Sequence, residues 1–481
     1  MILQGAFAEE PTSTRVSVTK SLFYKDSTLP FQLVEDYLIL EDQKTALSGQ
    51  KFRLSHARGT VIRSALAKLR PRMGSSCFIG PDSVAVAEIS RTRTARSWNK
   101  AAHAAFVPTG MVTVLLGPLL PALSVRWSLN YAQAGSLFTA QFAGATVGTC
   151  LSGVIVSRWG FRYAINVGLF AMAVGVAGLP FSSHLLGLVC IFCYGSGLGL
   201  AIPAANLLVA AINPERRAAA LSLLNFSWSL GAVACPFVMA AAVKADELQL
   251  FLLLLAGLLF LVLVGIAVMP LYPLEAAAVA GNDGAGSPAV HWRGRSFFVL
   301  SGLFFLYVGV ENAFGGWIAS YAKSLGTLSP TSSVMTPSFF LAALMFGRWM
   351  APLALRKINE IKTARAGLSI ACLGMTGLLL SRTMPCVIGS VAFAGFGLAA
   401  VYPITISRLS REFGSAASQV GSVMFTVANL GGALLPWIVG YSSQKFKSLE
   451  IGLLVPLAAT ILMYVLYRRN WASALVPAQP A

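Results

Sequence analysis

The chain has 481 residues, of which 56% are hydrophobic and only 11% are charged, and its mean hydropathy is +0.71. Soluble domains carry about 25% charged residues, so this composition excludes a water-soluble fold, which has no means of covering so much apolar surface. The formal net charge of +18 does not indicate nucleic-acid binding. The basic residues of the main body lie in short segments between apolar runs, where they set membrane topology.

Residues 1–100 differ from the rest of the chain. They hold 15 Lys and Arg and 9 Asp and Glu, with no apolar run long enough to span a bilayer. This pattern predicts a basic, flexible cytoplasmic extension. Two alternatives stay open. One is a translation start placed too early, with Met73 as the true start, and the other is an organelle transit peptide, which the acidic residues disfavour.

Apolar segments fill the chain from about residue 102, each close to the ~20 residues that cross a ~30 Å hydrocarbon core. They predict an all-α membrane protein with twelve transmembrane helices in two pseudo-symmetric six-helix halves, over 101–272 and 296–470. A polar linker over 273–295 separates the halves, and 471–481 is a tail. The twelve predicted spans are 102–124, 132–155, 163–182, 185–211, 218–241, 249–272, 296–321, 333–355, 366–381, 385–405, 416–441 and 450–467.

The distribution of Lys and Arg predicts the orientation of this bundle. If the N-terminus is inside, the inner segments hold fourteen Lys and Arg and the outer segments hold six. Cytoplasmic segments carry the excess of these residues. We therefore expect both termini in the cytoplasm, and a multi-pass monomer embedded in the lipid bilayer of the inner cell membrane.

An internal repeat supports the division into halves. Tyr194–Pro203 (YGSGLGLAIP) matches Ala394–Pro403 (AGFGLAAVYP), and Leu230–Pro236 (LGAVACP) matches Leu430–Pro436 (LGGALLP), both at an offset of 200 residues. Membrane proteins with halves that repeat in parallel are often secondary transporters.

No catalytic or metal-binding pattern accompanies these spans, so the sequence predicts neither an enzyme nor a bound cofactor or metal. There is no Walker loop to bind ATP. Cys190 and Cys193 form a C-x-x-C motif inside an apolar run, where small packing residues are the favoured interpretation. The glycines of Gly195-x-Gly197-x-Gly199 follow no predicted strand, which favours close helix packing over nucleotide binding.

Glu311 is the one carboxylate that falls deep within a predicted span, the seventh. Charged groups inside a bilayer usually face a cavity or a partner, because burying them against lipid is costly. One hypothesis is that Glu311 contacts a substrate or a coupling cation, either a proton or sodium. The other is that it pairs with a nearby Arg or Asn and holds the halves together.

Uncharged polar and aromatic residues within the spans are further candidates for substrate binding. Amides can bond the hydroxyls of a ligand or tie two helices together, and aromatic rings can stack on a ligand or anchor a span end. The predicted substrate-binding residues are Gln141, Asn206, Asn225, Trp228, Glu311, Asn312, Trp317 and Asn429.

The segment between spans two and three combines glycines with cations. Gly153, Arg158, Gly160 and Arg162 follow each other at short spacing, and Arg348 is the counterpart after Gly347 in span eight. Cations at these helix ends can pair with carbonyls or acids of the adjoining half and so latch one conformation. The alternative is that they only set orientation.

These features resemble the major facilitator superfamily over about 102–470, and within it the fucose:proton symporter group. The loop from Gly153 to Arg162 is similar to the signature loop of the superfamily. Leu115–Pro121 (LLGPLLP), the Ala204-Ala205-Asn206 segment and Tyr402-Pro403 are similar to helices one, four and ten of the symporter group.

Three departures from this resemblance concern charge. Ser157 stands where the superfamily usually has Asp, which weakens the expected latch. The symporter group uses an Asp in helix one and a Glu in helix four for proton coupling and sugar binding, and the aligned residues here are Gly117 and Ile202. The resemblance therefore leaves Glu311 as the remaining internal carboxylate for coupling, unless the protein is an uncoupled facilitator.

Three functions follow as hypotheses. The first is a secondary transporter or facilitator for a small neutral polar solute, a monosaccharide above all, that works by alternating access. The second is an efflux transporter of the same fold for a lipophilic compound. The third is a non-transporting membrane scaffold, which the matched halves disfavour.

Overall fold

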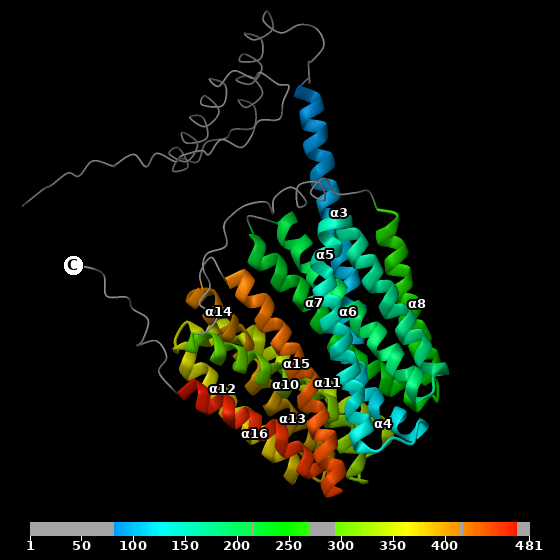
Figure 1. Cartoon of the computed structure of the whole chain (residues 1–481), viewed down its shortest axis with the longest axis vertical. Coiled ribbons are helices and arrows are strands. Elements are labelled where there is room, and N and C mark those ends of the chain that lie inside the picture. Colours follow the sequence, from blue (N-terminus) through cyan, green and yellow to red (C-terminus); the bar gives the residue numbers. More distant parts are fainter. Residues whose placement is uncertain (1–80, 214–215, 270–293, 414–416, 469–481) are drawn as a thin grey trace, which may run out of the picture. The chain divides into compact units, whose positions relative to one another are not determined.

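The computed structural model describes residues 81–213, 216–269, 294–413 and 417–468. The elements over these residues are helices (Figure 1). Most of the predicted extension, the linker up to residue 293 and the predicted tail lie outside the described residues. The helices are α3 (Pro81–Val114), α4 (Leu116–Arg126), α5 (Tyr131–Gly178), the 3-10 helix η1 (Leu179–Phe181), α6 (His184–Ile212), α7 (Arg217–Lys244), α8 (Leu248–Ala267), α10 (Arg295–Ser324), α11 (Pro330–Leu355), α12 (Glu360–Leu380), α13 (Met384–Leu398), α14 (Val401–Phe413), α15 (Ala417–Phe446) and α16 (Leu449–Arg468).

Ten of these helical segments are individually long and apolar enough to cross a membrane, with α13 and α14 forming one of them. The pair α3 and α4, bent by 45°, makes an eleventh span. Tyr131–Phe181 is counted once although it has 51 residues, about twice the ~20 that one crossing needs. Its backbone leaves the helical conformation at Gly160 (φ 84°, ψ 172°), so it makes two crossings. The predicted all-α fold of twelve spans is confirmed.

The repeated glycines lie where helices of one half touch each other. Gly195 on α6 packs against the backbone of Gln141 on α5, and Gly395 on α13 packs in the same way against Phe340 on α11. Gly231 on α7 and Gly431 on α15 likewise pack against α3 and α10. None of the four sites has room for a Cβ atom. The sequence repeat therefore marks equivalent helix contacts in the N-terminal half (α3–α8) and the C-terminal half (α10–α16).

The two halves are joined toward one end of the bundle. We name it the Asn130 end, because α5 begins there, and we name the opposite end the Gly160 end. Thr139 donates a hydrogen bond to the Ala433 carbonyl (3.1 Å), and Ser338 donates one to the Val233 carbonyl (2.9 Å). In Figure 1, α15 runs beside α5, in line with this contact.

Candidate functional site

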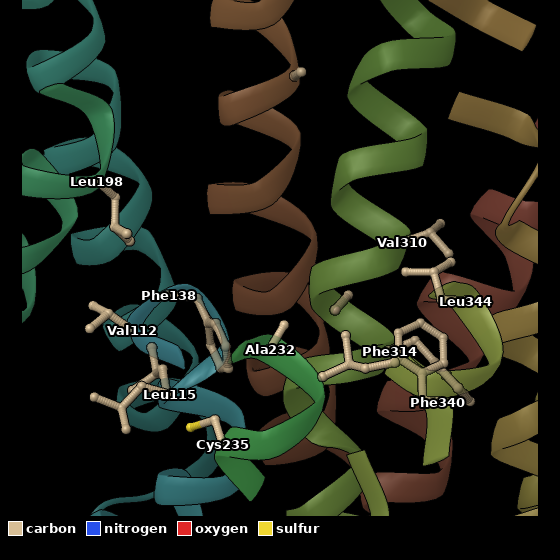
Figure 2. Close-up of a cluster of buried hydrophobic side chains, with 14 of the residues drawn as sticks. Val112, Leu115, Phe138, Leu198, Ala232, Cys235, Val310, Phe314, Phe340 and Leu344 are labelled. Atoms are coloured by element: carbon tan, nitrogen blue, oxygen red, sulfur yellow. The ribbon is translucent and has the colours of Figure 1, made fainter. Parts of the chain in front are cut away.

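A cavity of about 170 Å³ lies between the halves, and we call it the central cavity. The N-terminal half contributes α3, α4, α5 and α7 to its wall, and the C-terminal half contributes α10 and α11. Figure 2 shows the buried apolar side chains of this region, with Phe138 on the N-terminal half and Phe314 and Phe340 on the C-terminal half. The lining residues are Thr113, Val114, Leu116, Gly117, Phe138, Gln141, Phe142, Trp228, Glu311, Asn312, Gly315, Gly316, Pro337, Phe340 and Leu341.

A chain of hydrogen bonds holds the polar side of the N-terminal wall. The Tyr194 hydroxyl donates to Gln141 Oε1 (3.1 Å), and Gln141 Nε2 donates to the Thr113 carbonyl (3.1 Å). Trp228 Nε1 donates to the Thr113 hydroxyl (3.2 Å). Gln141 is only 3% exposed, so its amide is fixed at the wall. Because a primary amide has two N–H groups, one remains to donate to a ligand.

Glu311 and Asn312 supply the polar side of the C-terminal wall. Glu311 Oε1 lies 3.5 Å from Arg348 Nη2, and the same nitrogen donates to the Tyr307 hydroxyl at 3.1 Å. Asn312 Nδ2 donates to the Val308 carbonyl (2.8 Å), which leaves its side-chain oxygen and second N–H available. The Glu311 side chain is 17% exposed, so it reaches the cavity while it pairs with Arg348.

Each hypothesis for Glu311 agrees with one part of the geometry: the first with its place in the cavity lining, and the second with its Arg partner. The carboxylate lines the central cavity and also forms an ion pair. Its partner Arg348 belongs to α11 of the same half, so this pair does not tie the two halves together. Arg348 lies a turn or two before the end of α11 at Leu355, and its charge is directed inward at Glu311 rather than at an acid of the N-terminal half.

Four of the predicted substrate-binding residues lie elsewhere. Asn206 and Asn225 donate to carbonyls one turn earlier on their own helices, at Ile202 and Leu221 (both 2.9 Å). They are absent from the cavity lining, as is the half-buried Asn429. Trp317 is 1% exposed and lines a second pocket toward the Asn130 end. Gln141, Trp228, Glu311 and Asn312 are the predicted residues that the structure brings together.

The predicted latch residues surround the break in α5. Gly160 has the positive φ that favours glycine, while Gly153 and Arg158 are exposed. Arg162 Nη1 donates to the carbonyl of Met269, just after α8 (2.9 Å). Arg162 thus caps a helix end of its own half.

Several lining residues were not among the sequence-based candidates, most clearly Thr113, Phe138, Phe142 and Phe340. For two of them, the spacing from Gln141 in the sequence indicates a place on the same helix face. Phe138 and Phe142 lie three before and one after Gln141, which places all three on one face of a helix. No comparable signal marks Phe340.

Comparison with known proteins agrees with this architecture. The profile of the Major Facilitator Superfamily matches residues 103–436. A glucose/galactose transporter of Brucella abortus is 26% identical over 370 residues, covering 73% of this chain and 89% of the relative. A sodium-dependent glucose transporter 1A of Mus musculus is 21% identical, covering 78% and 96%.

Solved structures share the fold. A D-xylose–proton symporter superposes with a TM-score of 0.61 at 16% identity, covering 77% of this chain and 96% of that one. The fucose:proton symporter of E. coli gives a TM-score of 0.53 at 17% identity, covering 77% and 97%.

Proposed function

The chain belongs to the Major Facilitator Superfamily, and from this premise we propose that it carries a monosaccharide through the central cavity by alternating access. It is a multi-pass membrane transporter, and the relatives named above are transporters rather than enzymes. The observation that carries the substrate class is the convergence of Gln141 from one half with Glu311 and Asn312 from the other. An amide on one side of the cavity, with an amide and a carboxylate on the other, suits a solute with hydroxyls all around it.

The size of the central cavity supports a small solute. Its volume of about 170 Å³ is well below the about 300–1,000 Å³ that is common for pockets of drug-sized ligands. Phe138, Phe142, Phe340 and Trp228 add apolar faces that suit the C–H face of a sugar ring. The cavity therefore favours a monosaccharide over a bulky lipophilic cargo, and the named substrates of the relatives agree.

Glu311 is the residue that we assign to cation coupling. It is the carboxylate in the cavity lining, and the relatives include sodium-dependent and proton-coupled sugar transporters. At Gly117, aligned above with a coupling Asp, an added Cβ would lie 3.0 Å from Gly316 Cα. A side chain at that position requires α4 and α10 to move apart by a few tenths of an ångström in this conformation. A proton or sodium ion would instead compete with Arg348 for Glu311.

The uneven distribution of Lys and Arg between the two ends of the bundle is the basis of the orientation that we propose. With both termini in the cytoplasm, the Asn130 end faces outward and the Gly160 end faces inward. The halves are joined at the outer end by contacts such as that of Thr139 with Ala433. This conformation corresponds to the inward-facing half of the transport cycle, in which substrate leaves toward or enters from the cytoplasm.

Uptake by proteoliposomes tests the proposal. Labelled glucose, galactose, xylose and fucose would be offered with and without an imposed proton or sodium gradient. We expect saturable uptake of at least one hexose, lost in Asn312→Ala and retained in Asn225→Ala, the matched control outside the cavity lining. Uptake of lipophilic dyes with no response to sugars would contradict the monosaccharide assignment.

A further inference from the structure

A second pocket of about 470 Å³ lies at the Asn130 end, and we call it the vestibule. The end of α4, the start of α5 and the ends of α10 and α15 form it, so both halves contribute. The inference drawn from it rests on the proposed monosaccharide transport.

An aromatic layer separates the vestibule from the central cavity. Trp317 lines the vestibule, and its ring centroid lies 6.3 Å from that of Phe138, which lines the central cavity. The Tyr131 ring lies at the same distance on the vestibule side. Trp317 Nε1 donates to the Pro436 carbonyl (3.0 Å), which fixes the ring. The two pockets are therefore distinct compartments in this conformation.

The vestibule is rich in hydrogen-bond donors. Lys323 is exposed and donates to the Pro121 carbonyl (3.4 Å), which uses one of its three N–H groups. Gln444 Oε1 accepts from the Tyr131 backbone N–H, and Asn130 Oδ1 accepts from that of Gln133. Each amide oxygen thus accepts one hydrogen bond, and the NH₂ groups remain as donors. Among the described residues that line the vestibule, Lys323 carries a charge and none carries a carboxylate.

The central cavity has the opposite chemistry. Its charged lining residue is Glu311, which is an acceptor when ionised. A carboxylate on a sugar would meet a cation and several N–H donors in the vestibule. In the central cavity it would meet Glu311, and the neighbouring Arg348 is already paired with that residue. Like charges at close range cost free energy, and opposite charges gain it.

We propose that the vestibule is a binding site for carboxylated monosaccharides, such as hexuronates, which hold the two halves together at the Asn130 end and so inhibit hexose uptake without being transported. Lys323 pairs with the carboxylate, and the amides of Gln444 and Asn130 donate to the hydroxyl oxygens. A single opposite-charge contact at an exposed site gives a preference of about fivefold over the neutral sugar at low salt. This preference weakens as ionic strength rises.

The test uses the full-length protein in proteoliposomes with the orientation determined by an impermeant reagent. Glucuronate on the Asn130 side is expected to inhibit labelled hexose uptake, and labelled glucuronate is not expected to accumulate. Lys323→Gln should weaken inhibition about fivefold, measured as the inhibition constant of glucuronate relative to the hexose KM of the same variant, because the substitution also removes the bond to Pro121. Lys445→Gln, which removes another exposed cation of the same end outside the lining, should leave inhibition unchanged.

Three results would overturn the inference: no inhibition, equal effects of the two lysine variants, or accumulation of glucuronate as cargo. Direct binding of labelled glucuronate to the purified protein separates this inference from the proposed function. Binding that depends on Lys323 but without hexose uptake would retain the vestibule site and reject monosaccharide transport. Hexose uptake without Lys323-dependent binding would retain monosaccharide transport and reject the vestibule site.

Discussion

At the scale of single residues, the position of a side chain on its helix decides whether it serves the site. Asn206, Asn225 and Asn312 all donate to a carbonyl four residues earlier, yet only Asn312 lines the central cavity. The sequence indicated that these amides lie within spans. It could not indicate which of them face the other half, because that depends on the rotation of each helix against its neighbours.

Glu311→Gln is expected to lower hexose uptake at least about tenfold. Hydrogen bonds to charged groups contribute about 1.5–3 kcal/mol, and the amide retains the shape of the carboxylate without its charge. The variant also leaves Arg348 without its ion-pair partner. Uptake is measured in proteoliposomes at matched protein content, with size-exclusion chromatography to verify folding.

The double variant Glu311→Gln/Arg348→Gln separates a structural from a functional role. It removes both charges and so restores the charge balance of the pair. If Glu311 acts on substrate or cation, the double variant remains inactive although it folds. Recovery of uptake would show that the pair only stabilises the C-terminal half.

Gly316→Ala is expected to raise the hexose KM several-fold. An added Cβ would lie 2.6 Å from the Phe138 ring, so the ring has to move within the cavity wall, and overpacking of this kind costs about 1–3 kcal/mol. Gly302→Ala is the control on the same helix, since nothing lies within 4 Å of its added Cβ. Equal effects of the two variants would exclude a local change at the cavity.

At the scale of helices, the apolar segments predicted the spans because each must bury about twenty residues in lipid. The boundaries that differ have local reasons. The tenth predicted span, 385–405, is interrupted between α13 and α14 at residues 399–400, because Pro403 has no N–H to donate to the Ala399 carbonyl. The helix α3 begins at Pro81, well before the predicted 102, because a helix can continue beyond the membrane where hydropathy is low.

The paired glycines give a prediction at this scale. Gly231→Ala and Gly431→Ala should each lower the thermal unfolding midpoint in detergent by a similar amount, because each Cβ would meet the backbone of the equivalent helix in its own half. Gly257→Ala on α8, with nothing within 4 Å of the added Cβ, should leave the midpoint unchanged. Clearly unequal losses in Gly231→Ala and Gly431→Ala would contradict equivalent packing of the two halves.

At the scale of the whole molecule, transport requires that the contacts at the Asn130 end break and re-form. Each hydrogen bond between the halves contributes about 0.5–1.5 kcal/mol. Bonds of this size favour the conformation that is closed at the Asn130 end, but they are weak enough for the other conformation to form. The sequence predicted two matched halves, but not which end is joined, because both conformations arise from the same chain.

Thr139→Val with Ser338→Ala should shift this balance toward opening at the Asn130 end. The changes remove the hydrogen bonds to Ala433 and Val233, and the loss of about 1–3 kcal/mol in total changes the ratio of conformations by about 5-fold to about 160-fold. In a cysteine-depleted background, Asn312→Cys should react faster with an impermeant maleimide added at the Asn130 end. Ser196→Ala, which removes a bond within α6 only, is the control, and equal rates in both would contradict the assignment.

The close approach of Gly117 to Gly316 links residue size to the separation of the halves. An added Cβ at Gly117 would lie 3.0 Å from Gly316 Cα, so a side chain there requires α4 and α10 to move apart by a few tenths of an ångström. Because the two glycines belong to opposite halves, a larger residue at Gly117 favours conformations in which α4 and α10 lie further apart.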